Sequence, residues 1–310
     1  MRVFIAGCGR SGTSYLKTLI SAHPELYIPT ETLCLADFLQ FSPRFSRRLL
    51  RFLFFNEPQI KSWYKGDSFE FCSVRDAIET IHQKTAENRG AIYWGQKTPR
   101  FVRYIDLFER HFPDMKWVLI YRDPRAVVLS MRKSKQHSYS VKRACRRWQR
   151  DNQPILKFLQ QGTPDNVCIV KYEELIANME EALNKIFTFL SFKTMTLNEV
   201  LEAAQVEWFQ GSRFVNNQIR DGIKPHRTFV DKWRNVLSLA DVALIEHLCA
   251  DEMDILGYDK TGEKTNLQRI SRVDFFRRFK DVAILFEYLY RWPSYLFHTL
   301  IRKCLLFFQT

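Results

Sequence analysis

The chain offers little cysteine chemistry, because none of its seven cysteines stands in the C-x-x-C spacing of a zinc site or a redox pair. They are scattered, and their number is odd. This distribution excludes a cysteine zinc cluster and is typical of a reducing compartment. No other group of histidine, cysteine or acidic residues has the spacing of metal ligands, so we expect no metal. We also find no internal repeat and no low-complexity tract.

Long apolar runs are missing as well. No uninterrupted hydrophobic stretch reaches the roughly 20 residues that a membrane-spanning helix needs. No signal peptide precedes the first predicted strand, which begins at residue 2. We therefore expect a cytoplasmic protein, either free or held peripherally on the inner face of a membrane.

Acidic residues are outnumbered, since 34 Asp and Glu face 47 Lys and Arg, for a net charge of +13. Such a balance favours an anionic ligand, an acidic macromolecule or a membrane surface, and it says nothing about fold. We expect no nucleic-acid partner. The length of 310 residues and the 46% hydrophobic content suit one large α/β domain with an appendage.

The stretch from Val3 to Leu16, VFIAGCGRSGTSYL, has the order of strand, glycine-rich turn and helix. Glycines let backbone N–H groups converge, and a helix N-terminus adds partial positive charge, so this order predicts an anion site. The spacing Gly7-x-x-x-x-Gly12-Thr13-Ser14 nearly matches the P-loop pattern G-x-x-x-x-G-K-[ST]. Thr13 replaces the lysine, which argues against ATP or GTP hydrolysis. The alternative is a strand, turn and helix without a ligand, and a phosphate site is the better interpretation.

Four further strands are predicted, over residues 26–28, 91–94, 116–121 and 166–172. The run at 116–121 is continuously apolar, as in the centre of a parallel sheet. We predict a P-loop-like, three-layer α/β/α fold with a central parallel sheet over residues 1–265, followed by a C-terminal helical extension over 266–310. A helix from Ser238 to Leu256 closes the main domain.

Polar side chains follow these strands at the sheet edge where ligands bind in open α/β folds. Glu31 follows a strand that we expect beside the first, Lys97 follows the third, and Arg122 follows the fourth. For Glu31 two interpretations stay open: a functional carboxylate, or a residue beside a helix that Thr30 caps. For Arg122, a surface pair with Asp123 is the alternative to a role at the site.

Four basic segments remain. Residues 132–150 hold eight Lys or Arg residues, with Trp148 on the apolar side. This basic segment is either a solvated helix face or a surface that attracts an acidic acceptor. Residues 41–65 read as a lid helix that buries its Phe face. Residues 208–235 are predicted to be a long irregular loop that can become ordered over an anion. The tail over 273–308 alternates basic and aromatic residues, so we expect it to lie on a membrane or to pack on the body or a second subunit.

Together these residues resemble the PAPS-dependent sulfotransferases, PAPS being 3′-phosphoadenosine 5′-phosphosulfate. The resemblance covers residues 1–260 and is strongest to the tyrosylprotein and carbohydrate branch, on RSGTS, HPEL, Glu31 and Lys97-Thr98-Pro99 in the family's order. It implies that Glu31 is the catalytic base, and that Lys97 and Arg10 stabilise the transferring group and the leaving phosphate. It implies that no metal is needed, and that PAP is the product. The implied PAPS contacts are Gly9, Arg10, Ser11, Gly12, Thr13 and Ser14 around the phosphosulfate, Arg122 and Ser130 on the 3′-phosphate, and Tyr172, Lys224, Lys232 and Trp233 elsewhere on the nucleotide.

One departure from the family concerns its K-G-x-x-G signature, where this chain reads Lys224-Pro225-His226-Arg227. The implied acceptor is a hydroxyl group. The basic helices and the amphipathic tail favour a glycolipid or an acidic saccharide as its carrier, and a tyrosine peptide or a small alcohol stays open. Two other functions stay open: a P-loop kinase of a small metabolite, and a non-catalytic protein that binds anions or membranes. The kinase predicts Mg²⁺-dependent ATP binding, and the missing lysine speaks against it.

Overall fold

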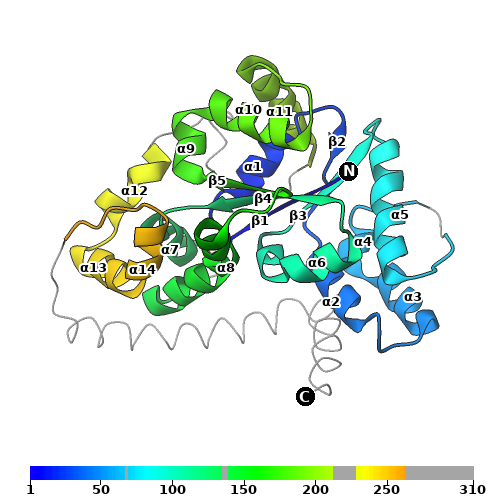
Figure 1. Ribbon diagram of the computed structural model, residues 1–310. Coiled ribbons are helices and arrows are strands. Elements are labelled where there is room, and N and C mark those ends of the chain that lie inside the picture. Colours follow the sequence, from blue (N-terminus) through cyan, green and yellow to red (C-terminus); the bar gives the residue numbers. More distant parts are fainter. Residues whose placement is uncertain (67–68, 135–138, 212–227, 263–310) are drawn as a thin grey trace.

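A five-stranded, all-parallel sheet forms the centre of the protein, as the computed structural model shows (Figure 1). The structure describes residues 1–66, 69–134, 139–211 and 228–262. The strand order is β2-β3-β1-β4-β5. The strands are β1 (Arg2–Gly7), β2 (Leu26–Tyr27), β3 (Tyr93–Lys97), β4 (Met115–Tyr121) and β5 (Val167–Lys171). The predicted parallel-sheet fold is confirmed.

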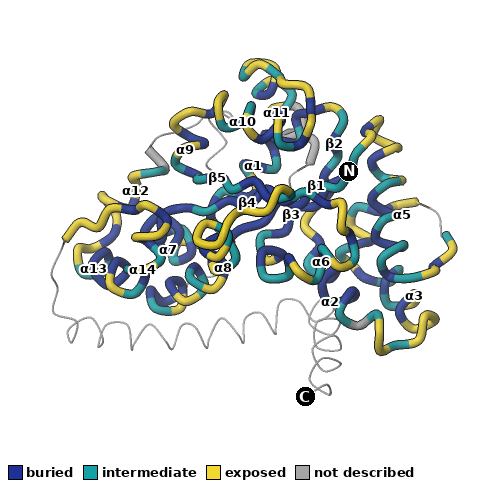
Figure 2. The backbone as a smooth tube through the Cα atoms, viewed as in Figure 1, coloured by how far each residue is buried: buried dark blue, intermediate teal, exposed yellow. Residues whose placement is uncertain are grey.

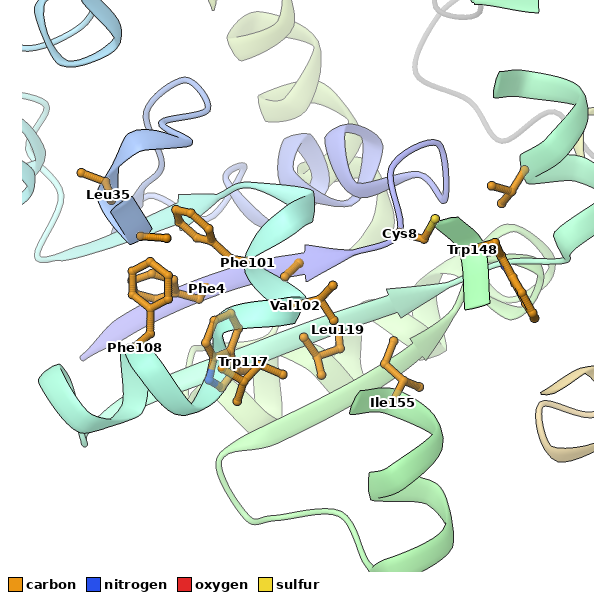
Figure 3. Close-up of a cluster of buried hydrophobic side chains, with 14 of the residues drawn as sticks. Phe4, Cys8, Leu35, Phe101, Val102, Phe108, Trp117, Leu119, Trp148 and Ile155 are labelled. Carbon is orange, nitrogen blue, oxygen red and sulfur yellow. The ribbon is translucent and has the colours of Figure 1, made fainter. Parts of the chain in front are cut away.

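Both faces of this sheet are buried, because successive side chains of a strand point to opposite faces. Phe4 of β1 and Trp117 of β4 belong to one core, whereas Val3 and Val118 belong to the other. In Figure 3, Phe4 lies beside Phe108, with ring centroids 5.1 Å apart. The continuous apolar run predicted for a central strand is therefore β4, which pairs with β1 on one side and β5 on the other.

Helices cover the two faces and complete the three layers (Figures 1 and 2). The layer over Val3 and Val118 contains α1 (Thr13–Ile20), α9 (Tyr172–Ala177), α10 (Met179–Leu190) and α11 (Leu197–Gly211). The opposite layer is larger and contributes the Phe4 core. Its helices are α2 (Cys34–Phe41), α3 (Arg47–Asn56), α4 (Pro58–Lys61), α5 (Val74–Glu87), the 3₁₀ helix η1 (Pro99–Tyr104), α6 (Ile105–His111), α7 (Pro124–Lys133), α8 (Val141–Gln161), α12 (Thr228–Val236), α13 (Leu239–Leu248) and α14 (Ala250–Ile255).

Two strand predictions need correction. The second strand was expected beside the first, but β2 pairs with β3. The third strand runs through Lys97 instead of ending at Trp94, because Gly95 fits where a Cβ would lie 2.6 Å from the Val3 carbonyl oxygen. Gln96 and Lys97 are buried beyond it, so the strand continues to the sheet edge.

Helix predictions differ at their ends. The predicted irregular stretch 208–235 is helical at both of its ends, in α11 and α12. The predicted closing helix begins after Ser238, whose side chain accepts from the Asp241 N–H, and it breaks at Cys249 into α13 and α14. Of the C-terminal extension over 266–310, with its membrane-contact segment 273–308, every residue lies outside the described part. Within the described part, no helix is long and apolar enough to cross a membrane.

Candidate functional site

The turn between β1 and α1 is built on close backbone contacts that only glycine permits. A Cβ on Gly7 would lie 2.2 Å from the Ile120 carbonyl oxygen of β4. Gly12 has φ 95° and precedes α1, and a Cβ there would lie 2.5 Å from the Tyr172 ring. Tyr172 begins α9 directly after β5, so the ends of three strands meet at this turn. The sequence prediction of strand, glycine turn and helix is confirmed.

Arg10 occupies the strained position of this turn, with φ 75°, a value that non-glycine residues seldom adopt. Two contacts hold it there. Its Nε donates to Ser130 Oγ of α7 at 3.0 Å, and its carbonyl oxygen accepts from Nη1 of Arg122 at 3.4 Å. Burial, followed by the charges of Arg122 and Arg147, lowers the pKa of Arg10, which still remains a cation at neutral pH.

The N-terminus of α1 is open to an anion. Its N-cap, Gly12, has no side chain to cap the helix, and the first turn contains no acidic residue. The Ser11 hydroxyl is buried and has no hydrogen-bond partner among the described residues. N–H groups that no side chain caps, together with a spare hydroxyl at the positive end of a helix, fit a phosphate or sulfate oxygen. Thr13 is buried at the start of the helix, beside the exposed Ser14.

Glu31 and Lys97 form an ion pair next to this helix start. Lys97 Nζ contacts Glu31 Oε1 and also donates to Ser14 Oγ at 3.0 Å. The Lys97 side chain is 8% exposed, whereas that of Glu31 is 43% exposed. A carboxylate that reaches solvent is thus joined through a buried ammonium to the turn. The alternative in which Thr30 caps a helix is wrong, since α2 begins at Cys34 after Leu33.

Arg122 lies at the same sheet edge, directly after β4. Its guanidinium stacks over the Tyr172 ring, with Cζ 4.1 Å from the ring centroid, and its carbonyl oxygen accepts from Trp148 Nε1 at 2.9 Å. The alternative of an Arg122–Asp123 surface pair is wrong. Asp123 is buried and binds Arg125 instead, with 2.7 Å between Oδ2 and Nη2. Arg10, Arg122, Ser130 and Tyr172 are therefore brought together at this edge of the sheet.

The remaining residues predicted to bind the nucleotide differ in their surroundings. Trp233 is buried on α12, where the Arg125 guanidinium stacks 4.0 Å from its ring centroid. Lys232 is exposed on the same helix, and Lys224 lies outside the described residues. No group of metal-ligating side chains occurs within the described ranges.

Sequence reasoning missed one neighbour of the turn. A Cβ on Gly9 would lie 2.8 Å from Nη2 of Arg147, a residue of α8. Arg147 was counted only as part of a basic segment. Trp148 marks the apolar face of this helix, but the sequence pattern does not show what the neighbouring Arg147 contacts.

Comparisons with known proteins agree on one family. A family model described as Sulfotransferase family matches residues 2–196. A Caenorhabditis briggsae protein that carries the name of a candidate protein-tyrosine sulfotransferase is 24% identical over 284 residues, which cover 89% of this chain and 95% of that protein. The nodulation protein NoeE of Sinorhizobium fredii is 21% identical over 83% of this chain and 66% of its own length.

Solved structures agree on the fold. The sulfotransferase domain from the curacin biosynthetic pathway superposes with a TM-score of 0.55 at 18% identity, over 83% of this chain and 97% of that domain. A sulfotransferase domain from the Synechococcus olefin synthase superposes with a TM-score of 0.52 at 22% identity, over 80% of this chain and 94% of that domain.

Proposed function

The chain belongs to the sulfotransferase family, and from this premise we propose that it transfers a sulfuryl group from PAPS to a hydroxyl acceptor. One observation carries the proposal: Lys97 links the Glu31 carboxylate to Ser14 at the positive end of α1. Sulfuryl transfer needs an anion-binding site, a cation beside the transferring sulfuryl group and a base for the acceptor hydroxyl. The contact of a carboxylate, an ammonium group and a hydroxyl at the helix start supports these three roles.

The turn and the start of α1 suit the phosphosulfate end of PAPS. The residues proposed to hold it present the uncapped helix start, the buried Ser11 hydroxyl and the Arg10 guanidinium. An NTPase would need a lysine in place of Thr13 and a metal beside it. We propose that PAPS supplies the sulfuryl group here without a metal. The residues proposed to hold this end are Gly9, Arg10, Ser11, Gly12, Thr13 and Ser14.

In the proposed step, the acceptor oxygen forms a bond to sulfur while the bond from sulfur to the 5′-phosphate oxygen breaks. The bonding electrons leave with the phosphate of PAP, and Glu31 takes the acceptor hydroxyl proton. Lys97 and Arg10 offset the negative charge that grows on the bridging and sulfuryl oxygens. Glu31 is exposed enough to meet an acceptor from solvent, whereas Lys97 is buried beside the turn.

The nucleotide end is proposed to lie toward Arg122 and Ser130, which would bind the 3′-phosphate. Both residues contact Arg10, so the residues proposed to bind the two ends of PAPS are joined by hydrogen bonds. Tyr172, packed between Gly12 and Arg122, suits a contact near the ribose or the 5′-phosphate. Lys224, Lys232 and Trp233 remain proposed contacts elsewhere on the nucleotide, and Trp233 would have to share its ring with Arg125.

A thermal-shift comparison of PAP with ATP plus Mg²⁺ tests this function. We expect PAP to raise the melting temperature in the presence of EDTA, because a ligand that binds only the folded state stabilises it. ATP with Mg²⁺ should give a smaller shift. The opposite ranking, with a shift that needs Mg²⁺, would favour a metabolite kinase and contradict the proposal. If neither nucleotide shifted the melting temperature, the non-catalytic function of anion or membrane binding would be favoured.

A further inference from the structure

A basic pocket of about 440 Å³ opens beside the turn, on one face of α8. Four arginines and one tyrosine line it. The arginines follow the helical spacing i, i+3, i+4, i+7, which places them in a single row. Between the first and the last the helix rises by about 10 Å. The lining residues are Tyr139, Arg143, Arg146, Arg147 and Arg150.

The charge of this row is poorly compensated in the described part of the chain. Asp151 is the acid next to it; it is buried and is shared by Arg103 and Arg147. Neither Arg146 nor Arg150 has a carboxylate within 4 Å in that part, and both are exposed. Arg146 and Arg150, one helical turn apart and exposed, can each bind one oxyanion, so this face attracts a ligand that carries more than one negative charge.

The pocket adjoins the proposed sulfuryl-transfer site through Arg147. Its Nη2 lies against Gly9 of the turn, and its Nη1 donates to the Tyr139 hydroxyl at 3.2 Å. Arg143 stacks on the Tyr139 ring, 4.4 Å from its centroid. At the centre of the proposed site, the pKa of Arg10 is lowered by the charge of Arg147 and raised by that of Glu31. A ligand in the pocket would therefore lie next to the group that moves.

We propose that this pocket is an acceptor subsite, which holds the carboxylate or sulfate groups of an acidic oligosaccharide while one of its hydroxyls is presented to Glu31. The inference rests on the proposed function. The lining offers guanidinium donors and, apart from the Tyr139 hydroxyl, no acceptor. It therefore suits carboxylate and sulfate groups, which only accept hydrogen bonds, and a saccharide can carry such a group on each of its rings. The row of about 10 Å has room for two or three charged groups.

Calorimetry on the PAP-loaded protein tests the proposal. The probes are a hexasaccharide with uronate and sulfate groups, its carboxyl-reduced and desulfated form, and a tyrosine peptide flanked by glutamates. The test variant is Arg146→Gln/Arg150→Gln, which changes two exposed side chains. The control variant is Arg47→Gln/Arg51→Gln, which removes the same charge from exposed positions of α3.

We expect the charged hexasaccharide to bind the wild type and the control equally, and the test variant about tenfold or more weakly, through lost charge-assisted hydrogen bonds. The neutral form should bind weakly to all three proteins.

Equal binding of the charged hexasaccharide to both variants would overturn the subsite, as would no binding to the wild type. Binding of the acidic peptide alone would replace the saccharide with a protein acceptor. A parallel loss of PAP affinity in the test variant would assign the pocket to the nucleotide. Failure of the wild type to bind PAP would instead count against the proposed function.

Discussion

Arg125 and Arg10 are both buried or half-buried arginines at the same edge of the sheet, yet their surroundings differ in kind. Arg125 is enclosed by acids: it binds Asp123 at 2.7 Å and Glu246 at 2.6 Å, and it donates to the Asp259 carbonyl oxygen. Arg10 is held by a serine hydroxyl and lies close to two further arginines. The first charge is neutralised inside the fold, and the second is not.

The difference separates a structural cluster from a ligand site. A buried charge costs free energy unless it is paired, so the acids around Arg125 account for its place in the fold. Around Arg10 the fold supplies a serine hydroxyl and the charges of Arg122 and Arg147, with Glu31 at the outer side, whereas Arg147 also pairs with the buried Asp151. Positive charge that the fold leaves uncompensated is available to an anion. Each prediction below tests one side of this contrast.

The largest effect is expected for Glu31→Gln. It removes the proposed base while keeping the size of the side chain, so sulfuryl transfer should fall by a factor of roughly 10² to 10⁴. PAP affinity should be retained. Turnover is measured with labelled PAPS and PAP affinity by calorimetry. Asp254→Asn is the control, since Asp254 pairs with Lys260 at the surface, 2.7 Å away. Full turnover of the Glu31 variant would remove its role as base.

For the structural side, Arg125→Met leaves Asp123 and Glu246 buried without their cation. We expect the free energy of unfolding to fall by about 3–5 kcal/mol. Urea denaturation measures it. The control, Lys260→Met, breaks an exposed ion pair that stabilises by less than about 1 kcal/mol. If the two variants lost the same stability, the distinction between a closed cluster and a surface pair would fail.

His82 shows how the interior treats a charge that has no partner. Its ring lies between Trp63 and Trp94, with centroids 4.8 and 4.5 Å away, and burial lowers its pKa to about 4. The unfolded chain takes up this proton near pH 6.5, whereas the folded protein takes it up near pH 4. Stability is therefore full above pH 6.5 and falls as the pH drops toward 4, by roughly 3 kcal/mol.

Urea denaturation of the wild type and of His82→Phe between pH 7 and pH 4 measures this contribution. The variant should lack it and lose less stability on acidification. Parallel curves for the two proteins would show that His82 is protonated at little cost.

A smaller effect is expected for Arg122→Ala, on the ligand side of the contrast. Loss of a charged hydrogen bond should weaken PAP binding by about 1.5–3 kcal/mol, or roughly 10- to 150-fold. Calorimetry with PAP measures it, and Arg110→Ala, an exposed residue of α6, is the charge-matched control. Unchanged PAP affinity would remove Arg122 from the proposed 3′-phosphate site.

Most of the polar residues at the sheet edge could be predicted from the sequence, because local patterns determine where each strand ends. The glycine turn, the apolar run of β4 and the polar residues after each strand are short-range signals. They were enough to place Glu31, Lys97 and Arg122 at one edge of the sheet, where the structure shows Glu31 and Lys97 in contact. The family's motif order added the proposed roles.

Long-range pairing was out of reach of such patterns. The position of β2 beside β3 depends on which crossover packs best, and a two-residue strand has too few side chains to show it. The cluster of Arg125 with Glu246 joins residues 121 positions apart, and the contact of Arg147 with Gly9 joins two more distant segments. Charged residues read from sequence look alike until their partners are known.

The most direct test of the proposed donor site is the transfer of label from radiolabelled PAPS into an acceptor in an extract of the source cells. We predict a labelled product that forms in the presence of EDTA and is lost when excess PAP competes for the turn between β1 and α1. Incorporation of label from ATP that requires Mg²⁺, with none from PAPS, would contradict it.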